Sequence, residues 1–401
     1  MDYFDLNMNL TSEDIALREA ASKFAKEVMR PISVQIDQMT PEEAFGPESP
    51  YWDFMRQAYQ LGYHKLAFPE EVGGPGLNPL QIQIVMEELA WGSFGLTLNL
   101  NTTFDAAVAM AGSQEHVKEF TLPYCQCTDA SYLGCWAITE PDHGSDTAAV
   151  GHPSFRDPNI PAQCRARLDG DDYVINGQKA AWVSNGPLAN HILLMCQVDA
   201  SKGHAGGGMF IFDLDRPGIS KGKPLSKLGI RDLCQGEVYF DNVRVPKENM
   251  IVGPDIYEPT LQAFICLTLP TVGTWATGLA RAAFDETLLY ARQRVQGGKP
   301  LIEHPNVQQK IFDMFRKIEA SRQLCRSVLV YNYSHPFNPE KESSSMPWQP
   351  RPLRPRLLSK LQVMRFRFLA GMGFPENMWW RSSFEMPVQL WYVMDPMTLS
   401  L

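Results

Sequence analysis

The chain has 401 residues, of which 44% are hydrophobic and 20% charged, a balance typical of a globular protein and not of a disordered or fibrous one. Its 36 basic and 45 acidic residues give a net charge of −9, which excludes the basic surface of a nucleic-acid-binding protein. Eight cysteines are too few for a disulfide scaffold, and none has zinc-ligand spacing. We therefore expect reduced thiols and no metal site.

The N-terminal sequence MDYFDLNMNL contains neither the basic nor the apolar segment of a targeting signal, so we expect a cytoplasmic protein. The longest uncharged stretch, Leu261–Ala280, contains one proline, two glycines and four threonines. Because such a composition suits a core helix better than a lipid-exposed one, we expect no membrane span.

The first 125 residues have the pattern of successive helices. Thr11–Asp14 resembles a capping box, and Pro31 is expected to end the helix that follows it. Ser49-Pro50 and Asn78-Pro79 each combine an N-cap residue with proline at the first helical position, and Gly92 is expected to close the third helix.

The pattern changes at about residue 131 to short β-rich runs separated by Gly, Asp, Asn and Pro, which predicts an antiparallel barrel or sandwich. Within this region Asn176-Gly177 is a hairpin signal. After Pro246 two long helices are expected, at about 259–296 and 305–333. Helices, strands and helices in this order indicate an α+β fold and exclude a doubly wound sheet.

Two segments carry candidate chemistry. AITEPDHGSDTAA (Ala137–Ala149) is a strand that leads into a loop rich in hydroxyl groups, and KAAWVSNGPLAN (Lys179–Asn190) places Trp182 near Ser184. Hydroxyl and backbone groups suit the polar edge of a flavin, and a tryptophan suits its flat face. Taken singly, each segment is explained as well by a core tryptophan and a polar strand end.

Four segments in order resemble the acyl-CoA dehydrogenase family of FAD flavoproteins, over residues of about 5–335. They are LGYHKLAFPEEVGGPGLN, CWAITEPDHGSD, KLGIRDLCQGEVYFDNVRVP and YARQRVQGGKPLIEHPNVQQKIFDM. The resemblance implies a helical N-terminal domain (1–128), an antiparallel β-barrel domain (129–246) and an incomplete helical-bundle C-terminal domain (247–345), followed by an aberrant tail (346–401).

The resemblance also implies FAD as cofactor, an acyl-CoA substrate, an electron-transfer flavoprotein or similar acceptor, and a homotetramer that acts in fatty or organic acid degradation. By position, the residues expected at the flavin are Trp136, Ile138, Thr139, Ser145, Trp182, Ser184, Arg294 and His304. Ser145 would also meet the acyl-CoA, and Arg294 would reach the FAD of a neighbouring subunit. Two departures weaken the match, since Gly297 and Pro305 replace the family's usual aromatic and glutamine.

Family chemistry needs a carboxylate that removes the α proton of the acyl-CoA. It usually precedes a Gly-Thr or Gly-Ser step near the C-terminus, and in a minority of members it lies on the helix after the β domain. That helix reads LTLPTVGTW (Leu267–Trp275) here and contains no carboxylate, so the catalytic residue is not identified.

Residues 346–401 hold seven of the 18 methionines, four of the nine tryptophans and many prolines, a composition that does not suit bundle helices. A shifted reading frame takes the third base of each codon together with the first two bases of the next. Because Met and Trp each have a single codon, several residues of the shifted sequence are determined, and these match the family. With suitable third bases, the segment from Val363 can encode HAVQVFGGNGF, and later DGSND. We therefore interpret the tail as a frameshift, which would remove the base and leave the chain inactive. A divergent tail is the simpler alternative.

Three functions are left open by the sequence. The chain is an FAD-dependent acyl-CoA dehydrogenase, at least by descent, or a non-catalytic protein that binds flavin or acyl-CoA, or an unstable truncation product. A visible spectrum of the purified protein separates the third from the other two.

Overall fold

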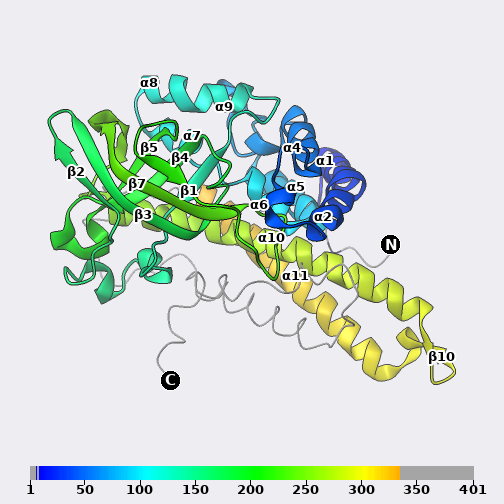
Figure 1. The fold of residues 1–401 in the computed structure, drawn as a ribbon. Coiled ribbons are helices and arrows are strands. Elements are labelled where there is room, and N and C mark those ends of the chain that lie inside the picture. The colour runs from blue at the N-terminus through cyan, green and yellow to red at the C-terminus, as the bar shows by residue number, and fades with distance from the viewer. Residues whose placement is uncertain (1–5, 7–8, 335–401) are drawn as a thin grey trace.

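The computed structural model describes residue 6 and residues 9–334, in which helices are followed by a sheet and then by two long helices (Figure 1). The tail at 346–401 and any base it would supply lie outside the described residues. The N-terminal helices are α1 (Ser12–Phe24), α2 (Arg30–Asp37), α3 (Pro41–Ala44), α4 (Pro50–Gln60), α5 (Pro79–Gly92), α6 (Phe94–Leu100), α7 (Asp105–Val108), α8 (Gln114–His116) and α9 (Leu122–Gln126).

The predicted helix starts are confirmed. Thr11 and Asp14 form a reciprocal capping box at the start of α1, in which each side chain accepts a hydrogen bond from the other residue's backbone N–H. The Asn78 side chain accepts hydrogen bonds from two backbone N–H groups of α5, and that helix ends at Gly92. Local capping chemistry is enough to fix these positions.

The prediction that Pro31 ends the first helix is wrong. The chain continues from α1 through a π-helical turn at Ala25–Met29 directly into α2. Pro31 lies in the first turn of α2. Because a π-helical turn changes the hydrogen-bond register, the backbone N–H that proline lacks is not needed there.

The middle region forms one mixed sheet from β1 (Gly134–Ala137), β2 (Arg165–Asp169), β3 (Asp172–Ser184), β4 (His191–Gln197), β5 (Gly207–Asp213), β6 (Ile219–Lys221), β7 (Gln235–Pro246) and β8 (Met250–Val252). The strand order is β6-β7-β3-β1-β4-β5-β8, and β2 pairs with both β3 and β4. A wholly antiparallel barrel is therefore a wrong prediction, because β1 and β2 both pair parallel to β4. No short hairpin joins either strand to β4, so turn chemistry does not dictate their direction.

The hairpin predicted at Asn176-Gly177 is also wrong, since both residues lie inside β3. The turn between β2 and β3 falls instead at Gly170, which has a φ of +67°. Gly177 has a φ of +133°, and a Cβ there would lie 2.6 Å from the Cα atom of Cys164. Its glycine therefore serves a close approach of two backbones rather than a turn.

Two long helices follow the sheet, α10 (Tyr257–Gln293) and α11 (Pro305–Ser334), as the sequence predicts. They lie side by side and antiparallel, and the short strands β9 (Val295–Gln296) and β10 (Lys299–Pro300) join them at their far end (Figure 1). A hydrogen bond of 2.9 Å between the hydroxyls of Thr277 and Ser321 links the two helices in the buried interior.

Among the described residues, α10 is long and apolar enough to cross a membrane by length and composition alone. Half of its most apolar window of 18 residues is buried inside the protein. Because core helices commonly meet the same criterion, this is weak evidence for a membrane span, although the sequence led us to expect none.

Candidate functional site

The ends of β1 and β3 bring together several residues that the sequence analysis singled out. Trp136 of β1 lies opposite Ser184 of β3 in the antiparallel register. The side-chain amide of Gln235 donates hydrogen bonds to the Ser184 hydroxyl at 3.2 Å and to the Trp182 carbonyl at 3.5 Å. Trp136, Trp182 and Ser184 are therefore held at one end of the sheet, each only partly buried.

Thr139 joins this group through β3. Its hydroxyl donates to the carbonyl of Ala180 at 3.0 Å, and the N–H of Ala180 donates to the carbonyl of Thr139 at 3.1 Å. The pairing of β3 with β7 is interrupted between Lys179 and Val183, and Ala181 has a φ of +59° there. The irregular backbone turns this part of β3 toward Thr139 and away from β7.

A buried ion pair lies directly beneath Thr139. The ammonium of Lys179 is 2.7 Å from Glu140 Oε1 and donates to the carbonyl of Ile138 at 2.9 Å. Glu140 also accepts hydrogen bonds from the backbone N–H groups of Gln163 and Cys164. The two side chains are 1% and 0% exposed, so every charge here is satisfied inside the protein.

An aromatic group places β1 against α10. The ring of Trp136 lies 5.2 Å from that of Phe264 and 5.7 Å from that of Phe104. Since Phe264 belongs to α10 and precedes Leu267–Trp275 by one helical turn, the candidate site faces this part of α10.

Ser145 lies in the loop that follows Thr139, at the start of a short 3₁₀ turn over Ser145–Ala148. The loop is fixed on both sides of it, because Gly144 N–H donates to Asp146 Oδ1 at 2.7 Å and the Thr147 hydroxyl donates to the Gly144 carbonyl at 2.6 Å. Ser145 itself is half-buried, and its link to the group at β1 and β3 is this loop.

Arg294 and His304 are not brought to this group within one chain. Both lie at the far end of α10 and α11, beside β10 (Figure 1). Arg294 is exposed just after α10, and a ring nitrogen of His304 lies 2.9 Å from the carbonyl of Gln296. Gly297 and Pro305, the two departures from the family pattern, occupy the same end.

Sequence reasoning missed the residues that support the site. Gln235 lies 51 residues after Ser184, and only the register of β3 with β7 brings the two together. The Lys179–Glu140 pair was not predicted, because other residues of the same two segments supported the flavin hypothesis. His143, Asp146 and His204 form a further cluster, described below.

Comparison with known proteins extends these observations. Three family models match, for the N-terminal domain (residues 11–127), middle domain (135–243) and C-terminal domain (269–344) of acyl-CoA dehydrogenases. The chain is 27% identical over 380 residues to "Short-chain specific acyl-CoA dehydrogenase, mitochondrial" of Rattus norvegicus, which covers 94% of this chain and 83% of that protein. It is 31% identical over 323 residues to "Probable acyl-CoA dehydrogenase fadE25" of Mycobacterium leprae, covering 80% and 76%.

Among solved structures, a glutaryl-coenzyme A dehydrogenase in complex with glutaryl-CoA superimposes with a TM-score of 0.77 and 26% identity, covering 96% of this chain and 91% of that one. The fold is thus that of a flavin-dependent dehydrogenase. The chain belongs to the acyl-CoA dehydrogenase family, whose members are enzymes that use FAD.

The C-terminal family model matches residues 269–344 and does not extend into the tail. The alignment with the rat enzyme covers a larger share of the chain than residues 1–345 make up, so it includes part of the tail. The frameshift interpretation stays a prediction.

The residues at β1 and β3 fit a flavin. The indole Nε1 of Trp136 is buried and has no hydrogen-bond partner within residues 9–334, a cost that a bound ligand with an acceptor would remove. Thr139 and Ser184 add hydroxyls to the same edge of the sheet, and the partly exposed Trp182 adds a flat apolar surface.

Proposed function

We propose that this chain binds FAD where β1, β3 and the first half of α10 meet, with Trp136, Ile138, Thr139, Trp182 and Ser184 around the isoalloxazine ring and Ser145 at the junction with an acyl-CoA. The pairing of Trp136 with Ser184, together with the two hydrogen bonds between Thr139 and Ala180, is the observation that supports this most directly. It gathers residues at one edge from two segments that are 41 residues apart at Thr139 and Ala180.

The hydroxyls of this edge have defined polarities. Thr139 donates its proton to Ala180, so its oxygen is left to accept a hydrogen bond from a ligand N–H. Ser184 accepts from Gln235, so its own proton is left for a ligand oxygen or nitrogen. The pyrimidine edge of an oxidised flavin has one N–H donor between two carbonyl acceptors and matches such a pair.

We further propose that the reaction at this site, when a catalytic carboxylate is present, is the α,β-dehydrogenation of an acyl-CoA thioester. FAD supplies the hydride acceptor, and the protein must supply a carboxylate at the substrate α carbon. Leu267–Trp275 offers none, and the usual C-terminal position falls outside the described residues. If residues 346–401 are the product of a frameshift, the usual C-terminal carboxylate is missing as well, and we expect little or no dehydrogenase activity from the chain as written.

The same lack of a carboxylate in Leu267–Trp275 favours a second candidate function. A chain that keeps the β1–β3 edge but has no base would bind flavin or acyl-CoA without turnover.

Membership of the family leads us to propose a homo-oligomer, to be tested by size-exclusion chromatography, and an electron-transfer flavoprotein or similar acceptor. The proposed cytoplasmic location rests only on the composition of the N-terminal sequence. Arg294 is exposed at the end of the α10–α11 hairpin, a position suited to contact the FAD of a neighbouring subunit through its guanidinium.

The test uses the full chain in both reading frames after Ser345. Each protein is purified with FAD, its flavin content is measured from the visible spectrum, and a panel of acyl-CoAs is added without oxygen. Because the rat relative is named as short-chain specific and a structural neighbour binds glutaryl-CoA, short and dicarboxylic acyl chains come first. Flavin bound by both proteins but bleached only in the restored frame supports the proposal, and absence of flavin from both contradicts it.

A further inference from the structure

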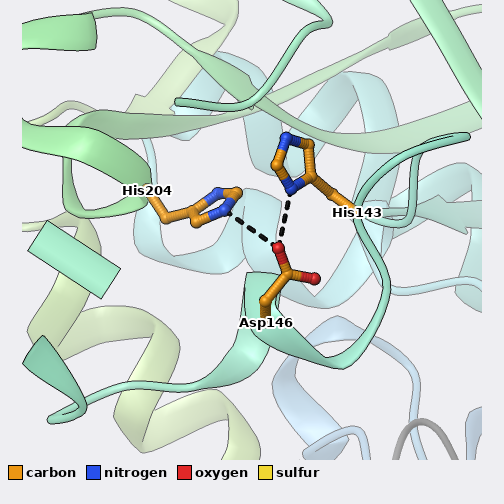
Figure 2. Close-up of side chains that lie close together, drawn as sticks. All are labelled: His143, Asp146 and His204. Carbon is orange, nitrogen blue, oxygen red and sulfur yellow. Dashed lines mark hydrogen bonds and ion pairs between the residues drawn. The ribbon is translucent and has the colours of Figure 1, made fainter. Parts of the chain in front are cut away.

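Two histidines and an aspartate converge beside the loop that carries Ser145 (Figure 2). His143 Nδ1 lies 2.7 Å from Asp146 Oδ2, and His204 Nε2 lies 3.3 Å from the same oxygen. The three potential ligand atoms all lie within 4.8 Å of one another. We propose that His143, Asp146 and His204 bind a divalent transition metal ion of the Zn²⁺ type.

The second imidazole supports a metal rather than a hydrogen-bond network alone. His204 is 5% exposed, and its Nε2 points at Asp146 without the geometry of a hydrogen bond and without another partner among the described residues. A buried ring nitrogen in this state costs free energy unless something binds it. Zn²⁺ bound by imidazole nitrogen and carboxylate oxygen would satisfy all three atoms together.

The distances from Asp146 Oδ2 to the two imidazole nitrogens are close to those of such a site. With metal–ligand bonds of about 2.0–2.1 Å, tetrahedral ligand atoms are separated by about 3.3 Å. The His204–Asp146 distance already equals this value, and the His143–Asp146 distance of 2.7 Å would have to lengthen slightly. Asp146 is 41% exposed, so an ion can enter from solvent and keep water as a fourth ligand.

The surrounding groups hold the ligands in position. Gly144 N–H donates to Asp146 Oδ1, which leaves Oδ2 directed at both imidazoles. The backbones of Glu140 and His143 exchange hydrogen bonds of 2.8 and 3.2 Å. On the other side, the Phe155 ring stacks on His204 at 5.9 Å. Outer contacts of this kind usually orient metal ligands.

The charges also suit a cation. Asp146 directs Oδ2 at both imidazoles, and a carboxylate oxygen with two imidazole nitrogens is a ligand set that a divalent cation accepts. Two lysines of the adjoining segments are already paired, Lys179 with Glu140 and Lys202 with Asp199 and Asp255. A bound ion would therefore meet a net negative site.

The ion would join two segments that are distant in sequence. His143 and Asp146 belong to the loop that holds Ser145, and His204 belongs to Ala200–Gly206. Gly203 sets the direction of this second segment with a φ of +61°, where a Cβ would lie 2.5 Å from the carbonyl oxygen of Asp157. Metal binding would thus fix the Ser145 loop against the sheet whether or not flavin is present.

The test is a titration of the chelator-treated full chain with Zn²⁺ by calorimetry, and with Co²⁺ followed by its visible absorption. We expect one equivalent to bind, and His204→Gln and Asp146→Asn each to weaken binding by at least about 100-fold. His152→Gln is the matched control, because His152 is exposed in the same region and the hydrogen bonds of its side chain within the described residues go to Ser154. Its affinity should equal that of the unchanged chain.

Two results would overturn the proposal. One is the absence of a saturable site, and the other is Zn²⁺ binding that both ligand variants retain. If circular dichroism shows that His204→Gln does not fold, the test rests on Asp146→Asn alone, which is isosteric and changes a half-exposed residue.

Discussion

Breaking the buried Lys179–Glu140 pair should destabilise the protein more than any surface change near it. In Lys179→Met, the Glu140 carboxylate stays at 0% exposure with two backbone N–H donors but no cation. Removing one partner of a buried pair leaves an uncompensated charge and typically costs about 3–5 kcal/mol of unfolding free energy. The pair also holds Ile138, so the loss should loosen the strand end next to Thr139.

The assay is urea unfolding followed by far-ultraviolet circular dichroism, in a double-mutant cycle with Glu140→Gln. The double variant has no buried charge, so it should recover at least about 2 kcal/mol relative to the sum of the single changes. Lys247→Met is the matched control, because its partner Asp171 and Lys247 itself are exposed, and it should leave the unfolding midpoint unchanged. Additive single effects, or a Lys179→Met midpoint equal to that of the control, would refute the reasoning.

Three further predictions concern the site and its supports. Trp182→Ala should lower the ratio of bound FAD to protein after gel filtration, whereas Trp52→Ala, a change in a helix of the N-terminal domain, should keep that ratio in whatever protein remains folded. Burial alone would raise the pKa of Glu87, but Arg322 and Arg281 outweigh it and lower the pKa to about 2. The stability that Glu87 contributes is present above about pH 4.5 and is lost as the pH falls toward 2. The decrease in the free energy of unfolding across that pH range should therefore be smaller in Glu87→Gln than in the unchanged chain. Gly177→Ala should lower the thermal midpoint more than Gly170→Ala, because a Cβ at Gly177 meets the backbone of Cys164 while Gly170 faces open space; equal midpoints would contradict this.

The sequence predicted those elements whose determinants are local. The capping residues Thr11, Ser49 and Asn78 stand where the helices begin, because a side chain and a nearby backbone N–H decide each start. Pro31 failed as a stop signal because a π-helical turn, invisible in the sequence, precedes it.

Non-local pairing was not predictable in the same way. Asn176-Gly177 has the composition of a turn, yet contact with Cys164 across the sheet places it inside a strand. The direction of β1 against β4 depends on a partner more than 50 residues away, and no short connection specifies it.

The candidate site shows the same difference between what the sequence predicts and what only non-local pairing determines. Trp136, Thr139, Trp182 and Ser184 were found because family resemblance marks them, and the register of β1 with β3 then joins them. His204 had no such signal, since its spacing from His143 and Asp146 follows no metal-ligand pattern in the sequence. Only the folded chain brings the three together.

The most direct test of this account is anaerobic acyl-CoA addition to the FAD-loaded chain, read as loss of flavin absorbance, for the sequence as written and for the frame restored after Ser345. We predict that both chains carry flavin at the β1–β3 site and that only the restored chain is bleached. Full bleaching and turnover by the chain as written would contradict the account, because its segment Leu267–Trp275 contains no carboxylate.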